Sequence, residues 1–195
     1  MIPTREEALR LLREAASHNP GPWEAHSETA AFCAERIAAA CGMDADKAYV
    51  LGLLHDIGRR YGRMHFGHVV QGYRYMQSLG YDEAARICLS HSFVEGTIGE
   101  YVGNLDVPQA DVDEMMRILA LRPMDDYDRL IQLCDTLAGC GEVLDMDVRM
   151  DDVERRYGQF PPGKRQAKKN LRAYFEQRCG KDLYSLFQKE PEVTY

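Results

Sequence analysis

The chain has 195 residues, enough for one well-packed domain and short for two. Its net charge of −7 and pI near 5.4 argue against nucleic-acid binding through overall charge, so nucleic acid is an unlikely partner. No apolar stretch approaches bilayer length, and the first residues carry charges where a signal peptide has an apolar core. The six cysteines form no C-x-x-C pair. We therefore expect a cytoplasmic protein without a membrane partner.

The first half of the chain has helical periodicity. Thr4 followed by Glu7 has the form of a capping box and predicts a helix that runs to about Ser17. The break Asn19-Pro20-Gly21-Pro22 ends this segment, and Gly42 and Gly80 are typical of positions just after a helix. Four further helices are predicted over about 23–41, 44–58, 66–79 and 82–91.

The second half continues the helical pattern with longer connections. Several glycines and Pro108 predict a loop over 93–108 with one short helix, followed by helices over about 109–121 and 125–138. A loop over 139–150, a short helical turn and Pro161-Pro162 lead to a basic terminal helix over about 163–178. No segment alternates like a strand beside hairpin signals. The fold class is therefore predicted to be all-α, a bundle of about eight to nine helices.

Histidine and aspartate side chains interrupt the apolar faces of these predicted helices. A polar side chain is costly to bury without a partner, and a buried carboxylate is rarely found alone. Any one of these histidines could be an ordinary core or surface residue, and one near a helix end could simply complement the helix dipole. One shared metal centre explains all of the inward positions together, whereas His18 and His65 lack an inward setting and are predicted to lie at the surface. The inward set comprises His26, His55, Asp56, His68, His91 and Asp135.

The order H…HD…H…H…D on a helical chain resembles the HD superfamily of metal-dependent phosphohydrolases. Three segments carry the resemblance: E-A-H-S-E-T-A at 24–30, L-L-H-D-I-G at 53–58 and L-C-D-T-L at 133–137. It implies a single HD-type domain over 1–195, with a core over 23–140 and a C-terminal helical extension over 151–195. It also implies a hydrolase that takes a small phosphorylated substrate.

The same resemblance implies the metal ligands. His26, His55, Asp56 and Asp135 would form a primary site. The segments G-H-V-V-Q-G at 67–72 and S-H-S at 90–92 look like the subset in which His68 and His91 hold a second ion and Asp56 bridges both. Imidazole and carboxylate ligands suit iron, manganese, cobalt or nickel, and the resemblance favours iron among them. Two such ions would activate a bridging hydroxide for attack on phosphorus.

Bacterial enzymes that cleave diadenosine tetraphosphate symmetrically are the nearest subset by ligand order, and they imply a nucleotide or dinucleotide phosphoester or phosphoanhydride as substrate. Gly72-Tyr73-Arg74 stands where cyclic-dinucleotide phosphodiesterases have a GYP signature. The mononuclear 5′-nucleotidase type has acidic residues after the HD pair, where this chain has arginines. That phosphatase remains an alternative, as does a non-catalytic HD module that binds a nucleotide.

Arginines after the HD pair are candidates for binding substrate phosphates. These are Arg59, Arg60 and Arg63, and Arg59, closest to the ligand pair, is predicted to act in catalysis with Asp56. Residues that determine specificity are expected in the 93–108 loop and around 122–129. Residues 155–181 contain nine Lys or Arg and one acid. This basic segment is expected to pack against the acidic stretch before it or against an identical subunit, which makes a homodimer possible.

Overall fold

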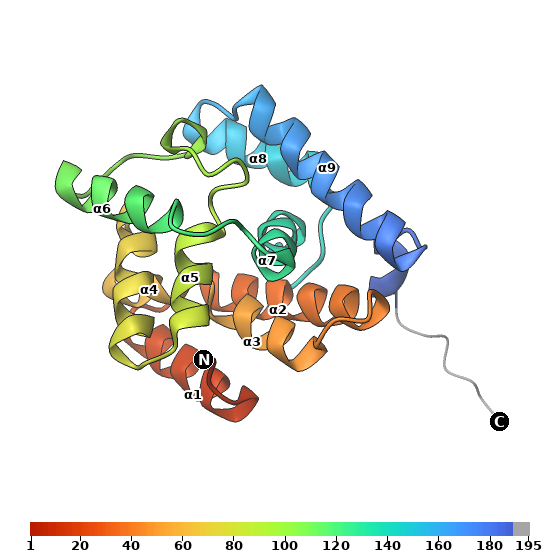
Figure 1. Cartoon of the computed structure of the whole chain (residues 1–195), viewed down its shortest axis with the longest axis horizontal. Helices are drawn as coiled ribbons and strands as arrows, with labels where there is room; N and C mark the ends of the chain where they lie inside the picture. Colours follow the sequence, from red (N-terminus) through yellow and green to blue (C-terminus); the bar gives the residue numbers. More distant parts are fainter. Residues whose placement is uncertain (189–195) are drawn as a thin grey trace.

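A computed structural model describes residues 1–188, which form nine α-helices and three short 3-10 helices (Figure 1). The all-α prediction is confirmed: these residues contain no strand, only an isolated bridge between Ala138 and Val143. Residues 189–195 of the predicted C-terminal extension lie outside the described residues. The helices are α1 (Arg5–His18), α2 (Trp23–Ala40), α3 (Ala45–Leu54), η1 (Ile57–Tyr61), α4 (Phe66–Ser78), α5 (Asp82–Ser90), η2 (Ile98–Glu100), α6 (Gln109–Leu119), α7 (Asp126–Leu137), α8 (Met146–Tyr157), α9 (Pro162–Cys179) and η3 (Leu183–Phe187).

Two predicted boundaries are wrong. The third helix was expected to reach Gly58, but α3 ends at Leu54 because Asp56, at φ −104° and ψ 13°, leaves α-helical geometry. The chain continues as the 3-10 helix η1, whose first bond runs from the Arg59 amide to the Asp56 carbonyl. The short turn expected after residue 150 is the twelve-residue helix α8, which Asp145 caps at its start.

Helix α2 is rich in alanine, and this composition lets its neighbours approach closely. Ala30, Ala31, Ala34 and Ala38 are fully buried. A side chain at Gly52 of α3 would come within 2.8 Å of the Ala31 backbone, so the α2–α3 contact requires glycine there. Helix α7 packs against both α2 and α3. The close packing places the ends of α2, α3 and α7 beside one another.

A second apolar cluster holds the segment that follows α5. The rings of Phe66, Phe93 and Tyr101 pack against one another in edge-to-face or tilted pairs, with centroids 5.1–6.1 Å apart. Val112 and Met115 of α6 complete the cluster. These contacts fix the loop after α5 against the start of α4.

Helices α8 and α9 lie beyond α7 from α2 and α3 (Figure 1). The outer face of α9 is basic and pairs with acidic side chains of α8, as in the ion pairs of Arg165 with Asp151 and Lys169 with Asp147 at 2.9 Å. The basic segment therefore packs against the acidic stretch that precedes it. In the part of the chain that the structure describes, no helix combines the length and apolar character required to cross a bilayer.

Candidate metal centre

The six candidate ligands predicted from the sequence come together from five parts of the fold. They form two groups of three, and within each group the candidate ligand atoms lie within 4.8 Å of one another. The first group contains His26 of α2, His55 just after α3 and Asp135 of α7. The second group contains Asp56 next to His55, His68 of α4 and His91 just after α5.

In the first group, two imidazoles face one carboxylate oxygen. The Nε2 atoms of His26 and His55 lie 3.0 and 3.7 Å from Oδ1 of Asp135. His55 is fully buried, and His26 is 6 % exposed. The three side chains thus converge on one point at the junction of α2, α3 and α7.

In the second group, Asp56 faces both histidines and also the first group. Its Oδ1 lies 3.1 Å from Nε2 of His68 and 3.7 Å from Nε2 of His91. Its Oδ2 lies 3.9 Å from Nε2 of His55. The two oxygens of one carboxylate are therefore divided between the two groups.

All four histidines are oriented by backbone carbonyls. The Nδ1 atoms of His26, His55 and His91 lie 3.1, 2.7 and 3.2 Å from the carbonyl oxygens of Ala138, Gly52 and Ile87. Nδ1 of His68 contacts the His65 carbonyl in the same way. A carbonyl only accepts, so Nδ1 carries the proton in each case and Nε2 is left with its lone pair. The four Nε2 atoms, which keep a lone pair while the imidazole is neutral, face the two carboxylates.

This donor set fits divalent transition metals. Among the described residues, Nε2 of His55 and Oδ1 of Asp56 are buried without a hydrogen-bond partner. Buried polar atoms are normally satisfied, so these two atoms are suited to a cation. The set of four imidazoles and two carboxylates is of the kind that binds such metals.

The two carboxylates are held in the charged form. Burial acts to raise the pKa of Asp56, but the Arg59 guanidinium and the neighbouring imidazoles outweigh it and hold this pKa well below its usual range. Burial also opposes ionisation of Asp135, but the hydrogen-bonded His26 and the neighbouring His55 outweigh it and hold the pKa of Asp135 well below its usual range. Both acids are therefore ready to bind a cation at neutral pH.

The imidazoles differ between the groups. Burial and the Arg59 guanidinium lower the pKa of His68, and burial together with the neighbouring histidines lowers the pKa of His91 to about 3. Both are therefore neutral and available as ligands at neutral pH. Burial acts to lower the pKa of His55 too, but the two carboxylates outweigh it and raise this pKa. A cation that bound His55 would replace its proton.

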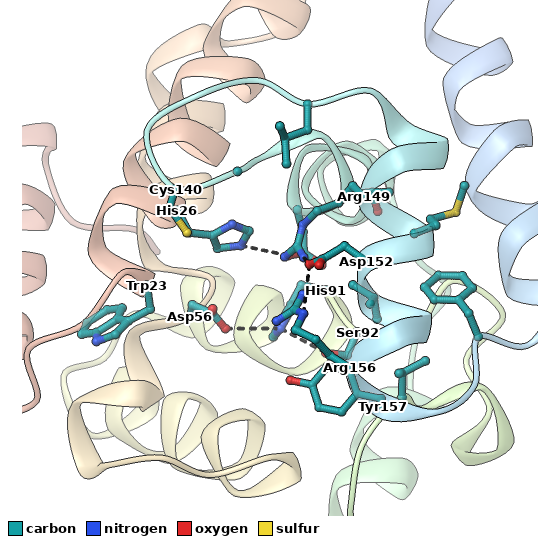
Figure 2. A pocket seen from close by; sticks show the side chains of 18 of the residues that line it. Trp23, His26, Asp56, His91, Ser92, Cys140, Arg149, Asp152, Arg156 and Tyr157 are labelled. Carbon is teal, nitrogen blue, oxygen red and sulfur yellow. Dashed lines mark hydrogen bonds and ion pairs between the residues drawn. The ribbon is translucent and has the colours of Figure 1, made fainter.

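A cavity of about 560 Å³ opens beside both groups. Five of the six candidate ligands line it, and His55 lies buried behind them. Figure 2 shows His26, Asp56 and His91 on one side of this cavity, with side chains of α8 on the other. The candidate ligands are thus accessible to a molecule of small-substrate size.

The three predicted arginines have different positions. Arg59 lines the cavity and donates from Nε to Oδ2 of Asp56 at 2.5 Å. The prediction for the other two is wrong: Arg60 points away, pairs with Glu14 at 3.3 Å and stacks on a tyrosine, and Arg63 is exposed and is not part of the cavity wall. The 3-10 geometry of η1 turns the successive side chains of Arg59 and Arg60 in different directions, and Arg63 lies beyond the end of η1 at Tyr61.

The expected specificity regions are only partly correct. Tyr101 and Val102 of the 93–108 loop line the cavity, but no residue from 122–129 does. His65 also departs from expectation, because it lies at the cavity wall, whereas His18 is exposed as predicted. The 122–129 segment caps α7 at the end remote from Asp135, which removes it from the site.

Sequence reasoning missed the wall formed by the last two helices. Arg149, Asp152 and Arg156 of α8 and Lys164 and Lys168 of α9 line the cavity. The three α8 residues are spaced i, i+3 and i+7, which places them on one helical face. That spacing was readable, but α8 was expected to be only a short turn. The basic character of α9 was noted without any indication that two of its lysines face inward.

The comparisons with known proteins agree with this geometry. The family described as HD domain matches residues 23–139, which include all six candidate ligands and leave α8 and α9 outside the match. Neither the curated proteins nor the solved structures contain a significant match to the chain. HD domains bind divalent metals and are in general metal-dependent phosphohydrolases. With more than half of its length matched, this chain belongs to the HD domain family.

Proposed function

We propose that this chain is a phosphohydrolase that holds two divalent metal ions and acts on a nucleotide or dinucleotide phosphoester or phosphoanhydride. The first group would hold one ion and the second group the other, with Asp56 shared between them. The observation that carries the proposal is the division of the two Asp56 oxygens between the groups, at 3.1 Å from His68 and 3.9 Å from His55. We propose iron as the native metal, with manganese, cobalt or nickel as alternatives.

The protein supplies orientation and electrostatics for this reaction. When bound, the ions would provide an activated water and neutralise charge on the phosphoryl oxygens. The carbonyl-bound imidazoles hold the donor atoms in place before any substrate arrives, so little reorganisation is needed. Arg59 sits against Asp56 at the cavity wall, where its guanidinium can stabilise charge that develops on the phosphate.

The reaction consumes one water. The water oxygen bonds to phosphorus, the bond from phosphorus to the leaving oxygen breaks, and that oxygen keeps the electron pair. The water protons end on the two products or in solvent. The two carboxylates and Arg59 leave the site with one net negative charge, so two divalent cations would make it positive overall and attractive to a phosphate.

Metal analysis and a hydrolysis screen test the proposal together. We expect about two ions per chain in protein purified without chelators, and turnover of at least one nucleotide or dinucleotide in a broad panel. His55→Ala and Asp56→Ala should lose metal and activity and keep the helical circular dichroism. His18→Ala is the matched control, because this exposed histidine lies outside the cavity.

The outcomes separate the alternatives. Retained turnover in both ligand variants would contradict the proposal. One ion per chain with phosphatase activity on nucleoside monophosphates would indicate the mononuclear 5′-nucleotidase type. Tight nucleotide binding by metal-loaded protein that hydrolyses nothing in the panel would indicate a non-catalytic binding module.

A further inference from the structure

One face of α8 points into the cavity opposite the candidate ligands. Arg149, Asp152, Arg156 and Tyr157 lie on this face, and all four line the cavity wall. Figure 2 shows them across the cavity from His26, Asp56 and His91. A molecule bound at the metal centre would therefore extend toward α8.

The α8 face carries more positive charge than its own acid neutralises. Asp152 pairs with Arg156 at 2.9 Å, with Arg149 at 3.5 Å and also with Arg155. One carboxylate thus serves three guanidinium groups. Among the described residues, neither Arg149 nor Arg156 forms an ion pair with any other acid. The arrangement holds both arginines at the cavity and leaves N–H groups of each available to an anion.

Two buried lysines of α9 add to the same wall. Lys164 is 6 % exposed and donates from Nζ to the carbonyls of Ser92 and Glu100 at 2.8 and 3.1 Å. Lys168 is 2 % exposed and donates to the Gln132 carbonyl at 2.5 Å. An ammonium has three N–H groups, so these contacts leave at least one free on each lysine. Burying an ammonium is costly. The carboxylates of Glu100 and Asp135 act on these lysines, but Glu100 already accepts backbone N–H groups and Asp135 faces the histidines of the first group, so an anion in the cavity would add compensation.

We propose that Arg149, Arg156, Lys164 and Lys168 form a subsite for a second phosphate group, so that the substrate is a phosphoanhydride such as a nucleoside polyphosphate or dinucleoside polyphosphate. The inference rests on the proposed function and narrows its substrate class. A phosphate monoester has one phosphate, which the metal centre and Arg59 would already neutralise. The four cations would then be matched only by Asp152 and by two acids, Glu100 and Asp135, that are already bound to other groups.

The subsite is contributed by the part of the chain outside the HD family match. Residues 23–139 supply the candidate ligands, and α8 and α9 supply the second wall. The family core would thus perform the hydrolysis, and the C-terminal helices would select substrates with an adjacent phosphate. Guanidinium groups suit this role because their paired N–H groups match phosphate oxygens.

The test compares substitutions of two neighbouring arginines and the binding of two small anions. Arg156→Gln removes a cation of the proposed subsite, whereas Arg155→Gln removes one that also pairs with Asp152 but does not line the cavity. Isothermal titration calorimetry measures the binding of methylenediphosphonate, a non-hydrolysable diphosphate analogue, and of orthophosphate to the metal-containing full-length protein. Metal content is measured before and after each titration, because the diphosphonate can chelate metal.

We expect the wild-type protein to bind the diphosphonate at least about tenfold more tightly than orthophosphate. Arg156→Gln should weaken diphosphonate binding about tenfold or more, the usual effect of losing a charge-assisted hydrogen bond, and change orthophosphate binding less than about twofold. Arg155→Gln should change neither. Equal effects of the two variants, equal losses for both probes or no wild-type preference for the diphosphonate would overturn the inference.

This design separates failure of the subsite from failure of the proposed function. The binding result needs no turnover, so it decides the subsite even if the wild-type protein hydrolyses none of the panel. Conversely, hydrolysis of monophosphates by a protein that shows no preference for the diphosphonate would support the phosphohydrolase and refute the second subsite.

Discussion

Replacing His68 with alanine tests the two-group arrangement directly. His68 belongs only to the second group, where it provides one of three candidate donors and lies 3.1 Å from Oδ1 of Asp56. The first group keeps all of its donors in this variant. We therefore expect His68→Ala to bind one ion instead of two and to lose activity that needs both.

The loss of folding stability in His68→Ala should be small enough for the variant to keep the native fold. The substitution removes the contact from Nδ1 to the His65 carbonyl, and the imidazole borders the cavity, so the space it leaves can fill with water. Loss of one hydrogen bond and of some packing costs about 1–2 kcal/mol. For a chain of this length that lowers Tm by roughly 2–8 °C. Loss of one of three donors should weaken binding of the second ion by on the order of 100-fold or more, above the range seen for outer contacts.

Plasma mass spectrometry of dialysed protein measures the ion count, and circular dichroism checks the fold. His18→Ala serves as control and should retain two ions. Two ions in His68→Ala would show that this histidine is not a ligand. Loss of both ions with the helical signal intact would show that the two groups do not act as separable sites.

Three further predictions follow from burial and close packing. Burial lowers the pKa of His91 to about 3, so below pH 6.5 this histidine binds a proton in the unfolded chain but not in the folded one. The free energy of unfolding of metal-free protein, measured in urea, should therefore fall from pH 6.5 toward pH 3. The fall should be smaller in His91→Gln. Gly58→Ala should lower Tm strongly in thermal melts and weaken metal binding, because the added Cβ would lie 1.9 Å from a backbone oxygen of α4. Gly99→Ala is the control and should change neither property, because the space around Gly99 is open. Asp128→Asn should reduce the free energy of unfolding by about 3–5 kcal/mol in urea titrations, because the fully buried Asp128 carboxylate pairs with the guanidinium of Arg86 in α5. A loss below about 1 kcal/mol would show that this pair does not stabilise the fold.

The helices were predictable where local signals mark them. Thr4 accepts from the Glu7 amide and starts α1, and η2 supplies the short helix expected within the 93–108 loop. The third helix ended early because Asp56 is turned toward the second group, a tertiary effect that apolar periodicity does not report. The length of α8 was underestimated because most of its residues are charged, so the apolar periodicity that marks a helix is weak there.

The candidate ligands were predictable because each is a polar interruption of an apolar face, and their convergence requires only that those faces meet in one core. The positions of Arg59 and Arg60 depend on side-chain direction within η1, and that of Arg63 depends on where η1 ends, neither of which local sequence signals report. The cavity residues of α8 and α9 could not be predicted, because their positions depend on how the chain packs after residue 139. Arg149 and Lys168 contact carbonyls at positions 138 and 132, and such pairings of distant segments leave no local pattern.

Anomalous diffraction from crystals of protein purified without chelators would test the central claim most directly. The account predicts two metal peaks in each chain, one bound by His26, His55 and Asp135 and the other by His68 and His91, with Asp56 between them. A single peak, or metal bound away from these side chains, would contradict it.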